Sequence, residues 1–214
     1  CALPICPVTR VPRWSGELLE WAGRHAAPDR FARLWRLLWR LQREPALRGD
    51  GLDPERVHLD GLARQVRRER HKLHAFVRFR PIQQALLDQP GLSEPLHVAW
   101  FEPDHHVVEV GAPFFARRFA AMRWALLTPR RSVRWDGRAL QFGPGARRED
   151  APGPDAGEAL WLAYYRATFN PARLKLAMMC REMPVRYWKN LPEAALITEL
   201  ADGAVERQGR MLGY

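Results

Sequence analysis

Histidines and carboxylates gather in two short stretches that could support chemistry, RERHKLHAFVRFR (residues 68–80) and WFEPDHHVVE (residues 100–109). Such groups hold metal ions, transfer protons or contact phosphate, and they also occur as ordinary surface residues. The candidate catalytic groups are His71, His74, His105, His106, Glu102 and Glu109. The HxxH spacing is loose, and no HExxH or CxxC pattern accompanies it. We therefore expect no metal and no cofactor, while a lesion-processing or nuclease-like enzyme stays an alternative.

Motifs for other common activities are missing from the sequence. There is no GxxxxGK[ST] loop, no GxGxxG loop and no GxSxG nucleophile elbow. The cysteines at positions 1, 6 and 180 form neither a disulfide framework nor a four-cysteine zinc site. Cys180 stands among apolar residues, which is typical of an inert core thiol. These observations favour a reduced, cytoplasmic binding protein.

Cations interleaved with aromatic residues are the strongest functional pattern. Lys and Arg number 34 against 24 Asp and Glu, which gives a net charge of +10, and such a surface attracts phosphate backbones. Bases that stack on aromatic rings would add roughly 1–3 kcal/mol each, unless those rings belong to the core. The predicted nucleic-acid contacts are Lys72, Arg78, Arg117, Arg118, Arg123, Trp124, Arg130, Arg131, Trp135, Arg186, Tyr187, Trp188 and Lys189.

Helical periodicity dominates the N-terminal half of the chain. The stretch PDRFARLWRLLWRLQR (residues 28–43) predicts an amphipathic helix with apolar and basic stripes. Its expected apolar stripe is Phe31, Leu34, Trp35, Leu38 and Leu41, and its basic stripe is Arg33, Arg36, Arg40 and Arg43. The basic stripe is either a solvated face paired with acids elsewhere or a ridge that follows phosphates. A second helix is expected from Pro54 to about His74.

Alternating patterns predict the sheet. Strands are expected from Phe76 and within LHVAWFEP, RWALLTP and SVRWDGRALQF, with Pro113 as the first residue of an intervening helix. The pair Asp136-Gly137 predicts a hairpin near 131–142 with a type I′ turn. The fold class is therefore α+β, with helices flanking a small, mostly antiparallel sheet and a helical C-terminal part.

The expected organisation is a single domain. It comprises an irregular lead-in (1–28) with a short helix near 17–23, an α+β core (29–142), a loop or linker (143–157) and C-terminal helices that pack on the core (158–208). The piece could also be a fragment of a longer fusion. No apolar run approaches the roughly 18 residues that span a bilayer, so no membrane partner is expected.

Four segments resemble a bacterial family of unknown function: HKLHAFVRFR, AWFEPDHHVVE, FFARRFAAMRWALLTPRRSVRWDG and FNPARLKLAMMCREMPVRYWKNLPEA. The resemblance covers about residues 28–200. Its members are described as probable DNA metabolism or putative DNA repair proteins, encoded beside a radical-SAM protein and fused to uracil-DNA glycosylase-like domains. The resemblance thus implies a pathway and partners, but no glycosylase motif is present here.

Together, the charge and the resemblance favour a DNA-binding accessory domain of a repair system, with single-stranded or distorted DNA as the preferred ligand. It would act with a uracil-DNA glycosylase-like domain or a radical-SAM protein. A protein-interaction module that docks such a partner through the helix at 30–43 is a further alternative.

Overall fold

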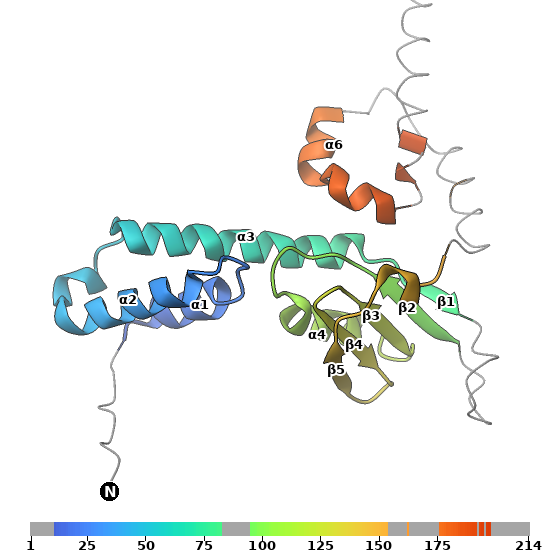
Figure 1. The fold of residues 1–214 in the computed structure, drawn as a ribbon, viewed down its shortest axis with the longest axis horizontal. Coiled ribbons are helices and arrows are strands. Elements are labelled where there is room, and N and C mark those ends of the chain that lie inside the picture. The colour runs from blue at the N-terminus through green and yellow to red at the C-terminus, as the bar shows by residue number, and fades with distance from the viewer. Residues whose placement is uncertain are drawn as a thin grey trace, which may run out of the picture. The chain divides into compact units, whose positions relative to one another are not determined.

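A computed structural model of the 214-residue chain describes residues 11–82, 95–153, 162, 176–191, 193, 194, 196 and 197. Within them the chain is α+β, as the sequence predicts (Figure 1). The helices are α1 (Arg13–Ala22), α2 (Arg30–Arg43), α3 (Pro54–Phe76), α4 (Val108–Arg118) and α6 (Leu176–Glu182), with short 3₁₀ turns η1 (Pro45–Arg48), η2 (Arg148–Asp150) and η4 (Val185–Asn190). The strands are β1 (Arg80–Ile82), β2 (Leu96–Trp100), β3 (Trp124–Leu127), β4 (Arg131–Trp135) and β5 (Leu140–Pro144).

The chain divides into two compact units, whose boundaries fall inside α3 and α4. The first unit contains residues 1–71 and 103–111, and the second contains residues 72–102 and 112–214. Most residues of the C-terminal helices expected at 158–169 and 192–208 lie outside the described residues.

In the first unit, α1, α2 and the start of α3 enclose a leucine-rich core (Figure 1). The buried side chains of α2 are Leu34, Leu37 and Leu41, which pack with Leu59 and Leu62 of α3. The expected apolar stripe is therefore partly wrong. Its aromatic members Phe31 and Trp35 are exposed, because the compact leucines fill the space between the helices.

Asp53 starts α3 and links it to α2. The Asp53 carboxylate is buried and accepts a hydrogen bond of 3.0 Å from the Arg56 backbone N–H. Its other oxygen lies 2.8 Å from Arg40 Nη1. With Pro54 as the first helical residue, this is a favourable helix N-terminus. The helix then runs to Phe76, so the strand expected from that position begins later, at Arg80.

The second unit is built around a five-stranded sheet in the order β1-β2-β3-β4-β5. Only the β2–β3 pair is parallel among the strands described, and α4 forms its crossover. Because paired residues share a face, Trp124, Leu126 and Val133 all point to one side and are buried there. Phe79 and Phe115 pack on Trp124 at this face.

Two local predictions about this sheet and its helix are corrected. The hairpin of β4 and β5 is present, but Asp136 does not have the positive φ that a type I′ turn needs. Instead, the Asp136 carboxylate accepts bonds from the N–H groups of Arg138 and Ala139, and only Gly137 in this turn has positive φ, at 96°. Pro113 lies inside α4 rather than at its start, because the helix begins five residues earlier.

Candidate nucleic-acid interface

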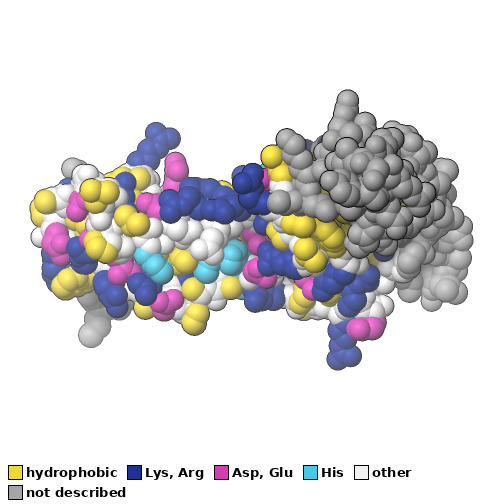
Figure 2. Space-filling view, turned by 90° about the horizontal axis from the view of Figure 1, so that it is seen from above, with side chains coloured by type: hydrophobic (Ala, Val, Ile, Leu, Met, Phe, Trp, Pro, Cys, Tyr) yellow, Lys and Arg dark blue, Asp and Glu magenta, His cyan; other side chains and the backbone are white. Residues whose placement is uncertain are grey.

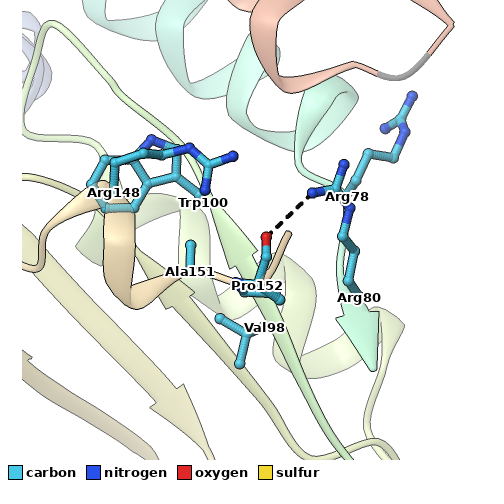
Figure 3. A pocket seen from close by; sticks show the side chains of 7 residues that line it. All are labelled: Arg78, Arg80, Val98, Trp100, Arg148, Ala151 and Pro152. Atoms are coloured by element: carbon cyan, nitrogen blue, oxygen red, sulfur yellow. Dashed lines mark hydrogen bonds between the residues drawn. The ribbon is translucent and has the colours of Figure 1, made fainter. Parts of the chain in front are cut away.

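A small pocket in the second unit brings together cations from three separate segments (Figure 3). Arg78 follows α3, Arg80 belongs to β1 and Arg148 belongs to η2. Figure 3 shows Arg78 and Arg80 on one side of the pocket and Arg148 on the other. The remaining lining residues are Val98, Trp100, Ala151 and Pro152. Among the described residues that line the pocket, none is acidic.

Each arginine is held in place by a different kind of contact. Arg80 Nη1 donates to the Pro152 carbonyl at 3.4 Å. Arg78 Nη1 donates to the Ala75 carbonyl at 2.8 Å, and its Nη2 lies 3.7 Å from a Glu193 carboxylate oxygen. The Arg148 guanidinium carbon lies 6.0 Å from the centre of the Trp100 ring. This arrangement concentrates cationic side chains around a largely apolar floor.

Glu102 holds two side chains in place, Trp100, which lines the pocket, and Lys189. The Trp100 Nε1–H donates to one Glu102 oxygen at 2.8 Å, and Lys189 donates to the other. Burial acts to raise the pKa of Glu102, but the bonds from Lys189 and Trp100 outweigh it and hold that pKa below its usual range. Glu102 is therefore ionised at neutral pH, so it positions Trp100 and Lys189 and is poorly suited to act as a general acid.

The same face of the sheet carries polar side chains away from the pocket. Strand register places Arg80, Val98, Ala125, Arg134 and Gln141 in one row across all five strands. Neighbouring strands are about 4.8 Å apart, so Arg134 lies roughly 14 Å from Arg80 along this row. A further cation, Arg134, therefore lies on the same face of the sheet as Arg80, three strands away.

The pocket has a cavity volume of about 20 Å³, which is room for one or two water-sized groups. A cavity of this size suits a projecting anionic oxygen group, such as part of a phosphate, and is too small for a base or a nucleoside.

Two of the four aromatic residues predicted to stack on bases lie in the core. Trp124 is fully buried, and Tyr187 is 1% exposed, stacked on Phe101 at 5.1 Å between ring centres. A base could reach neither ring in this structure. Trp135 and Trp188 are half-buried and donate to the carbonyls of Ala120 and Met183.

The predicted cations occupy several places in the second unit. Arg78 lines the pocket, Lys189 is bound to Glu102, which accepts a bond from the lining residue Trp100, and Lys72 lies 5.9 Å from the Tyr187 ring centre. Arg186 donates to the Tyr187 hydroxyl. The others do not line the pocket: Arg117 and Arg118 end α4, Arg123 precedes β3 and is half-buried, Arg130 precedes β4 and Arg131 begins it.

The histidines do not assemble into a metal site among the described residues, where no group of three or more potential ligands occurs. His105 is buried and stacks on His25, with ring centres 4.1 Å apart. His74 stacks on Phe114 at 4.2 Å. His71, His106 and Glu109 are exposed. His25 had no motif around it that pointed to this contact.

Arg80, Trp100 and Arg148 line the pocket but are not among the predicted nucleic-acid contacts. Trp100 lies in a recognisable strand, but the arginine near its ring, Arg148, comes from a distant segment. Arg148 lies in GPGARREDAPGPDAG (residues 143–157), whose composition indicates only a loop. The run of Arg147 and Arg148 was the one available signal.

A family model described as a domain of unknown function, DUF4130, matches residues 28–193, more than three quarters of the chain. The chain belongs to this family. The segment that matches DUF4130 contains every residue that lines the pocket. Comparisons with curated proteins and with solved structures returned no match. None of the helices in the described ranges is long and apolar enough to cross a membrane.

Proposed function

We infer that this DUF4130 domain is a DNA-binding accessory domain of a bacterial DNA repair or DNA metabolism system, acting in the cytoplasm. The observation that carries the proposal is the pocket, in which Arg78, Arg80 and Arg148 surround a site of suitable size for a phosphate oxygen group. The net charge of +10 supports it, because such a protein attracts polyanions over long distances.

Single-stranded or distorted DNA is the proposed ligand. A small pocket requires that one phosphate project into it, and a flexible strand can turn its backbone to do so. A regular duplex presents its phosphates on a stiff convex surface. A phosphate on such a surface reaches the mouth of the pocket but does not project into it. Since Trp124 and Tyr187 are buried, the preference rests on backbone flexibility rather than on stacking on these rings.

The resemblance to repair-associated proteins supplies the proposed partners. The domain would act with a uracil-DNA glycosylase-like domain or with a radical-SAM protein, by holding the DNA on which such a partner works. The described residues place no nucleophile or metal-ligand cluster in the pocket, so binding is proposed here and catalysis is not.

Fluorescence anisotropy tests this proposal with single-stranded, duplex and uracil-containing oligonucleotides over a range of salt concentrations. We expect tightest binding to single strands, with affinity that falls steeply as salt rises. The variant Arg80→Gln/Arg148→Gln should bind at least about tenfold more weakly, and its log–log salt slope should fall by roughly 0.7 for each lost phosphate contact.

A charge-matched control separates the pocket from net charge. Arg36→Gln/Arg138→Gln removes two exposed cations that do not line the pocket, and we expect it to change affinity by less than about threefold. Equal losses in the two double variants would show that binding is nonspecific. No binding by the unaltered chain at low salt would exclude the proposed function.

A further inference from the structure

An aromatic row lies on the outer face of α2, opposite the leucines that form the core. Phe31 is 60% exposed, Trp35 is 69% exposed and Trp39 is 46% exposed. Residues four apart share a helix face, so the three rings follow one another at steps of about 6 Å. The core of the first unit is closed by Leu34, Leu37 and Leu41 without them. Exposed rings in such number mark an interaction surface.

The arginines of α2 differ in their partners. Arg33 contacts Asp29 and Glu55, Arg36 contacts Glu55, and Arg40 contacts Glu44 and Asp53. Arg30 and Arg43 instead lie over the end rings of the row. The guanidinium carbons are 4.3 Å from the Phe31 ring centre and 3.9 Å from the Trp39 ring centre. Within the described residues, these two arginines have no carboxylate partner. The aromatic row is therefore positively charged at both ends.

The central ring of the row is the one left open. Trp35 makes no ring or cation contact with the described part of the chain, and its exposure is the largest of the three. Tryptophan and arginine together are the residue types that dominate protein–protein hot spots. A partner would bury Trp35 and place acidic groups on Arg30 and Arg43.

Charge selects the kind of partner. A second copy docked on the same face would bring arginine against arginine between chains that each carry a net charge of +10. A nucleic-acid strand would need ring faces for its bases, and Arg30 and Arg43 already cover a face of each end ring. An acidic, amphipathic protein segment satisfies both the rings and the cations.

We propose that the row Phe31, Trp35 and Trp39 docks an acidic amphipathic segment of another protein, with carboxylates on Arg30 and Arg43. The two arginines are 13 positions apart on α2, which corresponds to about 20 Å along the helix. The segment therefore has a central apolar side chain for Trp35 and acidic groups about 20 Å apart, which takes about six residues if extended. This surface shares no residue with the pocket, and the proposal does not depend on DNA binding.

Selection from a random 16-residue peptide display library on the full chain tests the proposal. We expect enriched peptides with a central apolar side chain and acidic groups toward both ends. A synthetic copy of an enriched peptide should lose at least about tenfold in affinity for Trp35→Ala, and should lose affinity for Arg30→Gln/Arg43→Gln. The control Leu52→Ala removes an even more exposed apolar side chain, 86% exposed, and should bind unchanged.

Other outcomes would overturn the proposal. These are a selection without Trp35-dependent peptides, a consensus without acidic residues, a chain self-association that Trp35→Ala abolishes, or an oligonucleotide affinity that Trp35→Ala lowers as strongly as the pocket variant does. Thermal unfolding of each variant confirms that the fold is retained. Because Trp35→Ala is expected to leave DNA affinity unchanged, failure here is distinguishable from failure of the DNA-binding proposal.

Discussion

Two arginine-rich regions of this protein use the same side chain for different purposes. On α2, Arg33, Arg36 and Arg40 face Glu55 and Asp53, so their charges are balanced. Figure 2, seen from the side of α3, shows acidic and basic side chains interspersed over the first unit, at the left of the view. Around the pocket, Arg78 also faces a carboxylate, that of Glu193, whereas Arg80 donates to a backbone carbonyl and Arg148 lies near an indole ring. Arginine content therefore says little about anion binding until the carboxylates are placed.

The paired arginines of the first unit should matter for stability, and Asp53→Ala gives the largest effect. It removes the buried N-cap of α3 and leaves Arg40 without this partner. We expect the free energy of unfolding to fall by about 2 kcal/mol, as for loss of a cap combined with a charge partner. Urea denaturation measures this change. Asp50→Ala, at an exposed position in the same turn, should change stability much less.

Acid should weaken the same contact. Burial acts to raise the pKa of Asp53, but the Arg56 backbone N–H and the Arg40 guanidinium outweigh it and lower that pKa. A carboxylate with a lowered folded-state pKa contributes its full stability above the unfolded value, about 3.9, and loses it as pH falls through the folded pKa. Stability of the unaltered chain should thus fall below about pH 4.

Asp53→Asn provides the comparison for that titration. It keeps a capping oxygen but cannot ionise, so its unfolding free energy should depend less on pH in the acid range than that of the unaltered chain. Parallel pH dependences in urea denaturation would show that Asp53 is not the responsible group.

Charge balance at the pocket gives the smallest predicted effect. Glu102→Gln retains an oxygen for the Trp100 N–H but removes the negative charge beside Lys189. We expect DNA affinity to rise about two- to threefold, since a partly exposed charge contributes roughly 0.5 kcal/mol. Anisotropy at two salt concentrations measures it, with Glu20→Gln on α1 as the control. A lower affinity would mean that Glu102 acts mainly by holding Lys189 in place.

The periodicity of apolar residues predicted helices and strands well wherever a segment fitted only one type of secondary structure. Helical spacing over 28–43 predicts α2, and alternation around Asp136-Gly137 predicts the β4–β5 hairpin. The errors arose where two signals competed. The α2 stripe could be drawn through the aromatics or through the leucines, and the pattern at Phe76 fitted a helix end as well as a strand start. Tertiary packing decided both cases.

The amino-acid sequence alone determined the α+β class, the strongly basic charge and the presence of an amphipathic α2, because composition and periodicity are local properties. The tertiary structure decided which cations are balanced and which converge. Glu55 of α3 forms an ion pair with Arg33 of α2. Arg148, which follows β5 in the chain, lines the same pocket as Arg78 and Arg80. Ion pairs and pockets depend on distances between residues remote in sequence, and those distances exist only after the helices and strands have packed.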